Sequence, residues 1–330
     1  MDHKFDVISI GDSTIDTFVK IHDATIECDI NKQECRICLN YGGKIPVEDI
    51  SHQVAGNAAN VSVGFATLGL KCAIYTHLGN DWQGDMIKDQ LYAKGVSGDY
   101  IVFEDNKNSN LSVVITYQGE RTILVYHQPW NYKLPKLDSS TWVYFGSLSE
   151  SFTNSNIVDE LYHYVDRAGV SLVFAPGTYQ LKADIKRYRH FLEKCDLLIL
   201  NMEEAKLVLG IDKSDKVEQK DVLSKLITLG PRLVVVTDAE HGSFASDGQK
   251  FLKAPVFPTK LVEKTGAGDA YACAFVAALI YNKSIEDAMI WGTVNASHVI
   301  QEIGAQNGLM SRVDIEEHRK TVPELVATTL

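Results

Sequence analysis

The chain has 330 residues, of which 45% are hydrophobic and 23% are charged, which is ordinary for a soluble globular protein. Its formal net charge is −11 and no basic stripe compensates for it, which argues against general binding to nucleic acid or to an anionic membrane. The N-terminus lacks the pattern of a signal peptide, and no stretch approaches the roughly eighteen uncharged apolar residues of a membrane span, so we expect a cytoplasmic protein.

Strand-like and helix-like segments alternate over most of the chain, beginning with a buried strand at residues 5–11. Further strands are expected at residues 71–79, 141–147, 170–177, 195–201 and 232–238. Helices are expected at residues 57–69, 83–95, 154–168, 202–209, 217–229, 269–282, 285–301 and 312–328. This alternation predicts a doubly wound α/β protein with a mainly parallel sheet and helices on both faces.

Two segments interrupt the alternation. Residues 17–53 have an irregular pattern that we interpret as an excursion from the main sheet, with short strands forming a flap. Residues 99–126 include two β-rich runs on either side of Gln-Gly-Glu, which indicates a β-hairpin. We therefore predict one domain over residues 1–330, with a small β-strand lid formed by these two insertions.

The sequence KTGAGDAYACAF, residues 264–275, contains the strongest candidate site. Its two glycines would let the backbone approach a ligand closely, and the amides at the start of the following helix would attract an anion. An acid, Asp269, stands beside this expected anion hole of Gly266, Ala267 and Gly268. Such an acid is useful if it takes a proton from a hydroxyl group that attacks phosphorus. The alternative is that Asp269 only caps the helix.

Four motifs occur in an order that resembles one known family. They are TGAGDAYACAF at 265–275, AGNAANVSVGFATLG at 55–69, ILNMEEA at 199–205 and VVVTDAEHGSF at 234–244. The chain resembles the ribokinase-like, or PfkB-type, carbohydrate kinases over residues 5–315. The resemblance implies a ribokinase-like fold and an ATP-dependent kinase that uses Mg²⁺ and phosphorylates a sugar or a nucleoside.

On the nucleotide side, the resemblance implies that Asp269 is the general base and that the amides of 266–269 stabilise the transferring phosphoryl group. It also implies that Asn201 and Glu204 hold Mg²⁺ and its waters, although both residues could instead start a helix. The remaining residues that it places at the nucleotide are Thr237, Gly242, Thr265 and Asn295. Gly242 could equally form a hairpin turn, and Asn295 or the nearby Thr293 could be a helix-packing residue.

On the acceptor side, the resemblance implies that Asp16 binds sugar hydroxyls and that Gly56, Asn57 and Asn60 form the opposite wall. Without it, Asp16 would read as a loop acid. These matched positions include no cation for a phosphate, which favours a free sugar or a nucleoside over a sugar phosphate. Loops that the sequence does not place could still bring Arg121 or Lys44 to the pocket.

Two metal sites are open at this stage. Glu263 and Lys264 occupy a region that helps relatives to bind a monovalent cation, and Lys264 could replace that ion or abolish its site. Cys28, Cys35 and Cys38 could bind Zn²⁺ if a fourth ligand joined them, but they could also be ordinary semi-buried or surface thiols. Without an export signal we expect no disulfides.

The leading hypothesis is an ATP-dependent carbohydrate kinase, with an adenosine-like nucleoside kinase as an alternative. A non-catalytic nucleotide or sugar sensor is a second class, which the presence of both Asp269 and the glycines disfavours. An NAD-dependent dehydrogenase is a third class, although the glycine fingerprint of such enzymes is incomplete here. The lids of relatives often form dimer contacts, so we expect a homodimer through the lid.

Overall fold

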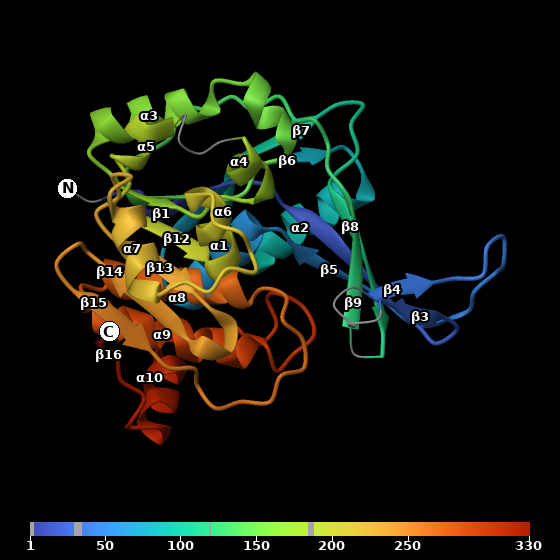
Figure 1. Ribbon diagram of the computed structural model, residues 1–330. Coiled ribbons are helices and arrows are strands. Elements are labelled where there is room, and N and C mark those ends of the chain that lie inside the picture. Colours follow the sequence, from blue (N-terminus) through green and yellow to red (C-terminus); the bar gives the residue numbers. More distant parts are fainter. Residues whose placement is uncertain (1–2, 30–34, 119, 184–187) are drawn as a thin grey trace.

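A ten-stranded sheet forms the centre of the computed structural model, which describes residues 3–29, 35–118, 120–183 and 188–330 (Figure 1). Its parallel strands are β1 (Phe5–Ile10), β6 (Cys72–Gly79), β7 (Ser97–Glu104), β10 (Ser140–Phe145), β11 (Ser171–Phe174), β12 (Leu197–Asn201) and β13 (Val234–Thr237). Three antiparallel strands continue one edge, namely β14 (Ser243–Ser246), β15 (Phe251–Ala254) and β16 (Thr328–Thr329). The order is β16-β15-β14-β13-β12-β11-β10-β1-β6-β7.

Helices cover both faces of this sheet. One face packs against α1 (Asn57–Thr67), α2 (Trp82–Ala93), α8 (Ala267–Ile280), α9 (Ile285–Val299) and α10 (Arg312–Thr321). The other face packs against α3 (Ile157–Ala168), α4 (Thr178–Lys182), α5 (Arg189–Leu192), α6 (Met202–Leu209) and α7 (Gln219–Ile227). Neighbouring residues of a strand point to opposite faces, so Val7 and Ile8 enter different core clusters. The predicted doubly wound α/β architecture is confirmed.

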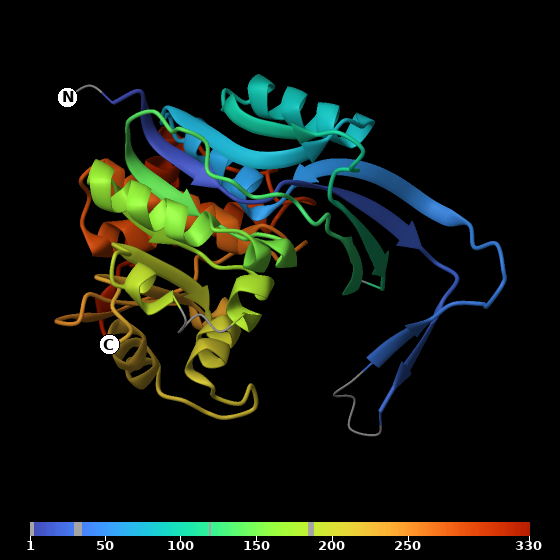
Figure 2. The ribbon, with the colours of Figure 1, turned by 90° about the horizontal axis from the view of Figure 1, so that it is seen from above.

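A separate four-stranded sheet projects from one side of the main body (Figure 2). Its order is β5 (Val47–Ala55), β2 (Thr14–Ile21), β8 (Leu111–Tyr117) and β9 (Glu120–Tyr126). The hairpin of β3 (Thr25–Cys28) and β4 (Cys35–Cys38) extends beyond it. Segments 17–53 and 99–126 contain strands of this sheet, but β7 overlaps the start of the second segment and belongs to the main sheet.

Two helical details differ from the expectation. The last helix ends at Thr321 rather than at 328, because Pro323 follows and cannot continue a helix. The chain also forms α4 and α5, which the sequence pattern did not predict. Short 3₁₀ turns occur at Glu150–Asn154 and Ala239–His241. Over the part of the chain that the structure describes, no helix has the length and apolar character needed to cross a bilayer.

The cysteine hairpin corrects a prediction. Cys28 and Cys35 lie directly opposite each other in the β3–β4 ladder, with their Cα atoms 4.0 Å apart, and they form a disulfide. The expectation that this chain has no disulfide is therefore wrong for this pair. A disulfide leaves neither sulfur as a thiolate, and only Cys38 of the proposed zinc ligands stays free. Within the described ranges, no group of three His, Cys, Asp or Glu side chains could hold a metal ion.

Candidate active site

The start of α8 presents backbone amides that have no partner within the helix. Gly266 is the residue before the helix, with a φ of 80° that favours glycine, and no side chain of the described residues caps the helix start. The first amides of an α-helix have no partner within the helix, and the helix dipole makes this end positive. A Cβ atom built on Gly268 would meet no atom within 4 Å. The Ala267 amide donates to the Lys264 carbonyl over 3.4 Å, whereas the amides of Gly268 and Asp269 have no acceptor among the backbone contacts of the described residues, as an anion hole requires.

Asp269 is the third residue of α8, and two amides of α1 hold its carboxylate. Asn60 Nδ2 donates to Asp269 Oδ2 over 2.7 Å, and Asn57 Nδ2 donates to Asp269 Oδ1. The carboxylate accepts no hydrogen bond from the amides of its own helix start among the contacts found in the described chain, so Asp269 is not a simple cap. Burial raises the pKa of Asp269 to about 6, against the lowering effect of the two amides and with a small further increase from the charge of Asp16.

A chain of amides fixes the orientation of Asn60. Gln306 Nε2 donates to Asn60 Oδ1 over 3.1 Å, and Gln90 Nε2 donates to Gln306 Oε1 over 2.9 Å. Because the Asn60 oxygen is occupied by a donor, its NH₂ group must face Asp269. Sequence reasoning missed Gln306 and Gln90, which lie outside every motif.

Asp16 lies on β2 and is almost completely buried. Burial raises the pKa of Asp16, while a hydrogen bond from Ser112 and the charge of Arg121 act in the opposite direction. Ser112 is its register partner on β8, so both side chains project from the same face of the four-stranded sheet. Gly56 precedes α1 with a φ of 96°, and a Cβ there would lie 2.6 Å from the Asp12 carbonyl oxygen. Glycine thus lets the start of α1 approach the β1–β2 turn.

A cavity of about 430 Å³ opens on the other side of the α8 start. Its walls are largely apolar and come from the β13–β14 region, the segment before α8, and helices α8 and α9. Predicted residues Thr237 and Gly242 line it, as do Lys264, Gly268 and Thr293. Asn295 does not: it is fully buried, donates to the Ala270 carbonyl and accepts from the Met310 amide. The structure thus places Asn295 in helix packing and away from the cavity.

Asn201 and Glu204 form a reciprocal cap at the start of α6. Asn201 Oδ1 accepts from the Glu204 amide over 2.9 Å, and Glu204 Oε2 accepts from the Asn201 amide over 2.8 Å. Asn201 is also the register partner of Thr237, which lines the cavity. Burial raises the pKa of Glu204 to about 7, and the charge of Asp269 adds to this. A buried carboxylate whose pKa is raised by burial and by a second carboxylate suits a site that receives a divalent cation.

One cation that the motifs did not assign reaches this region. Arg121 Nη1, from β9, donates to Glu263 Oε1 and to Thr265 Oγ1 in the segment that leads into α8. Arg121 forms the ion pair with Glu263 in the described structure. Lys264 instead lines the cavity. The second carboxylate oxygen of Glu263 is buried and has no hydrogen-bond partner in the described structure. A cation therefore does approach the site, although the matched acceptor positions include none.

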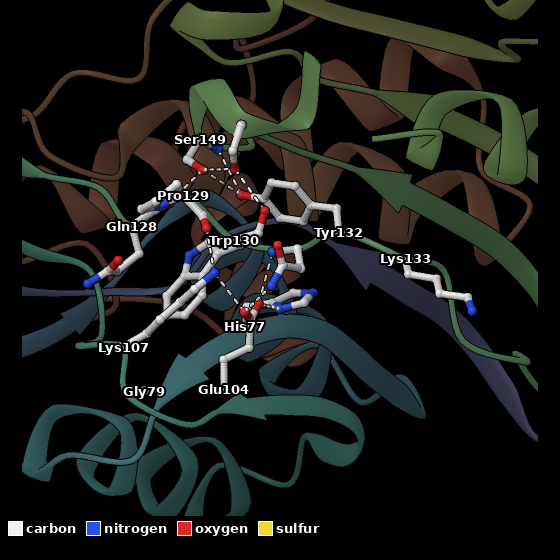
Figure 3. A network of polar contacts seen from close by, with 12 residues as sticks. His77, Gly79, Glu104, Lys107, Gln128, Pro129, Trp130, Tyr132, Lys133 and Ser149 are labelled. Atoms are coloured by element: carbon white, nitrogen blue, oxygen red, sulfur yellow. Dashed lines mark hydrogen bonds and ion pairs between the residues drawn. The ribbon is translucent and has the colours of Figure 1, made fainter. Parts of the chain in front are cut away.

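A network of polar contacts joins β6, β7 and the segment around residues 128–133 (Figure 3). Tyr132 donates to both carboxylate oxygens of Asp12, over 2.7 and 2.9 Å, and the Ser149 amide donates to Asp12 over 2.9 Å. Nearby, His77 Nδ1 lies 2.6 Å from Glu104 Oε1, and Lys107 pairs with Glu104. This network fastens the segment around residues 128–133 to β6 and β7 and fixes the turn that leads into β2.

Comparison with known proteins identifies a matching family and several relatives. The model described as pfkB family carbohydrate kinase matches residues 16–312. The chain is 26% identical to the ribokinase of Bacillus subtilis over 268 residues, which covers 79% of this chain and 86% of the relative. It is 25% identical to the 5-dehydro-2-deoxygluconokinase of Halalkalibacterium halodurans over 333 residues, which covers 96% of this chain and 94% of the relative.

Solved structures agree on the fold. The ribokinase of Arabidopsis thaliana, complexed with ribose and ATP, superposes with a TM-score of 0.75 at 21% identity, covering 94% of this chain and 97% of that chain. The nucleoside kinase of Methanocaldococcus jannaschii gives a TM-score of 0.77 at 18% identity, covering 97% of this chain and 100% of that chain. The expected ribokinase-like fold is thereby confirmed.

Proposed function

The chain belongs to the pfkB family of carbohydrate kinases and is an ATP-dependent phosphotransferase, and from this premise we propose that it phosphorylates a hydroxyl group of a sugar or sugar-like substrate. The observation that carries this proposal is the position of Asp269. Its carboxylate lies at the start of a helix whose Gly268 and Asp269 amides have no backbone acceptor among the described residues, and two asparagines orient it.

In this mechanism the Asp269 carboxylate takes the proton of the acceptor hydroxyl as the oxygen attacks the γ-phosphorus atom. The bond between that phosphorus and the oxygen it shares with the β-phosphate breaks, and ADP leaves. The amides of Ala267, Gly268 and Asp269 stabilise the negative charge on the transferring group. A pKa of about 6 leaves Asp269 ionised at neutral pH and still basic enough to accept a proton.

The largely apolar cavity beside Gly268 is the proposed site of the adenine and ribose of ATP. Thr237, Gly242 and Lys264 line it, and Thr265 precedes Gly266 in the segment that enters α8. Glu204, with Asn201, would hold hydrated Mg²⁺, since its carboxylate is near enough to Asp269 for the two charges to interact. When bound, Mg²⁺ neutralises charge on the phosphates. A monovalent cation could bind at this loop to Glu263 Oε2, which has no hydrogen-bond partner among the described residues.

The acceptor would bind between Asp16 on the four-stranded sheet and Asn57 and Asn60 on α1. A buried carboxylate such as Asp16 binds two hydroxyl donors well, as a sugar presents them. A nucleoside is the second candidate, because Val125 is 59% exposed on the same face as Asp16 and Ser112 and offers an apolar contact for a base. Both candidates use the same base and the same anion hole.

An ADP-release screen tests this function. The purified chain, ATP and Mg²⁺ are combined with free sugars, sugar acids, sugar phosphates or nucleosides, each with potassium or with tetramethylammonium. We expect turnover with one acceptor class in the wild type and none in Asp269→Asn. Binding of ATP without phosphorylation of any acceptor would instead support the nucleotide or sugar sensor.

We also propose that the protein forms a homodimer through the four-stranded sheet. Strand β9 is an edge strand of this sheet, and all its residues are exposed, including the apolar Leu124 and Tyr126. Exposed edge strands with apolar side chains pair readily with another chain. Light scattering of the wild type and of Leu124→Lys tests this, and a monomeric wild type would contradict it.

A further inference from the structure

We propose that Arg121 is a positioning residue that connects the four-stranded sheet to the loop that forms the anion hole. This inference rests on the proposed function, because it assigns a role in phosphoryl transfer to a residue that no motif includes. Arg121 comes from β9 and meets Glu263, 142 positions later in the chain. The contact joins the wall that carries Asp16 to the segment that enters α8.

Glu263 organises this segment. Its Oε1 accepts hydrogen bonds from the amide of Thr265, over 2.8 Å, and from the Thr265 hydroxyl. The Glu263 side chain is only 11% exposed, and a buried carboxylate requires a counter-ion. Arg121 is the one cation within ion-pair distance of it in the described structure. It therefore neutralises the group that closes the turn before Gly266.

Gly266 connects the turn at Glu263 and Thr265 to the first amides of α8. A Cβ on Gly266 would lie 2.5 Å from the Ala305 Cα atom, so the backbone there is packed tightly against the segment after α9. Thr265, just before Gly266, is hydrogen-bonded to Glu263, and α8 begins with Ala267, just after Gly266. The backbone at Gly266 has little room to adjust, so a displacement of Glu263 would also displace the amides of Ala267 and Gly268.

At its other end, Arg121 belongs to the four-stranded sheet that carries Asp16, which we call the acceptor wall. Arg121 is paired with Thr116 on β8, and β8 is paired with β2, which carries Asp16. The charge of Arg121 also lowers the pKa of Asp16. An acceptor that binds Asp16 thus contacts the same sheet that holds Arg121. We infer that occupation of the acceptor wall sets the geometry of the anion hole through Arg121, Glu263 and Thr265.

The experiment is a double-mutant cycle on phosphoryl transfer with the best acceptor from the screen. Arg121→Ala, Glu263→Gln and the double variant are compared with the wild type, and Arg232→Ala, which removes an exposed arginine paired with Asp196, is the matched control. We expect each single variant to lower kcat by about ten- to a hundredfold, since small displacements of reacting groups have effects of this size. The KM values for ATP and acceptor should change by less than about threefold.

Two results separate positioning from general structural damage. The double variant should be no slower than the slower single variant, because both substitutions break the same connection. Guanidinium ion added at millimolar concentration should restore part of the kcat of Arg121→Ala and none of that of Glu263→Gln. Thermal unfolding and ATP binding measured in parallel show that the variants are folded.

Several outcomes would overturn the inference. An unchanged kcat in Arg121→Ala would do so, as would additive losses in the double variant. A higher acceptor KM at unchanged kcat would assign Arg121 to acceptor binding instead. If the wild type itself phosphorylates no acceptor, the proposed function fails, whereas an active wild type with an equally active Arg121→Ala removes this inference alone.

Discussion

Asn60 Nδ2 lies 2.7 Å from Asp269 Oδ2, although the two residues are 209 positions apart in the chain. Asn57, one turn earlier on α1, donates to the other carboxylate oxygen. Both carboxylate oxygens of Asp269 therefore accept a hydrogen bond at the start of α8, and these two bonds fix the orientation of the side chain. A carboxylate has about four lone-pair sites, so a substrate hydroxyl can still donate to it while both asparagines remain bound.

The first prediction concerns Asp269 as the base. Asp269→Asn preserves size and keeps one acceptor oxygen, but an amide cannot take the proton of the acceptor. We expect kcat to fall at least about a hundredfold, the low end of general-base effects, while ATP affinity remains within about threefold. Steady-state kinetics and ATP titration measure the two quantities. Turnover equal to that of the wild type would remove Asp269 from the mechanism.

The second prediction concerns the pH dependence of kcat/KM. Asp269 has a pKa of about 6 and acts in its deprotonated form, so kcat/KM should be constant above this pH and decline as the pH falls through about 6. The hydrogen bond from Asn60 stabilises the charged form. Asn60→Leu should therefore move the decline to higher pH, in addition to lowering the plateau. A profile that keeps its midpoint in Asn60→Leu would show that another group titrates.

Sequence patterns predicted an anion hole at the start of α8 because its requirements are local. Two glycines, an acid and a helix start lie within residues 264–275, and few functions other than phosphate chemistry require that combination. The position of Arg121 could not be read in the same way. The hairpin of β8 and β9 was predicted, but the contact of Arg121 with Glu263 depends on how the four-stranded sheet lies against the body, and this leaves no signal near residue 121.

Two positions at which the sequence left alternatives open share a physical cause. Asn295 occupies a position at which a polar residue can face a ligand or satisfy buried backbone groups, and only tertiary packing shows that it bonds to Ala270 and Met310. The cysteine spacing was compatible with zinc, but the direct cross-strand pairing of Cys28 with Cys35 brings those two sulfurs together. Register, which the sequence specifies only indirectly, decided between the alternatives.

The third prediction uses the two glycines as a matched pair. Gly268→Ala places a methyl group in open space at a helical position, so thermal stability should be unchanged or slightly higher. The same methyl group would occupy the space that we assign to the phosphoryl group, so kcat should fall by at least about tenfold. Unchanged kcat would mean that the transferring group does not approach Gly268.

Gly266→Ala should instead lower the stability of the fold, in contrast to Gly268→Ala. Its φ of 80° is strained for alanine, and the new Cβ would lie 2.5 Å from the Ala305 Cα atom. We expect a loss of about 2 kcal/mol or more in the free energy of unfolding, together with lower activity. Chemical denaturation of both variants measures the difference, and equal stability of the two would contradict the close packing described here.

The fourth prediction concerns the buried carboxyl group of Asp12, whose pKa is raised to about 7 by burial despite its hydrogen bonds from Tyr132 and Ser149. A folded-state pKa above the unfolded value means that the folded protein binds the proton more tightly. This contribution to stability is therefore complete at low pH, below the unfolded pKa, and is lost as the pH rises through about 7. Asp12→Asn cannot ionise and should lose less stability between about pH 5 and 8 than the wild type does.

Asp16, Asp269 and Glu204 also have raised pKa values, but they titrate in both proteins, so the difference between the two stability curves isolates Asp12. Tyr132→Phe is the complementary variant, because it removes the donor that contacts both carboxylate oxygens. It should destabilise the fold by about 1–3 kcal/mol, and by more at pH 8 than at pH 5, since the charged form of Asp12 needs that donor most. Parallel curves for wild type and Asp12→Asn would show that Asp12 keeps one protonation state throughout this range.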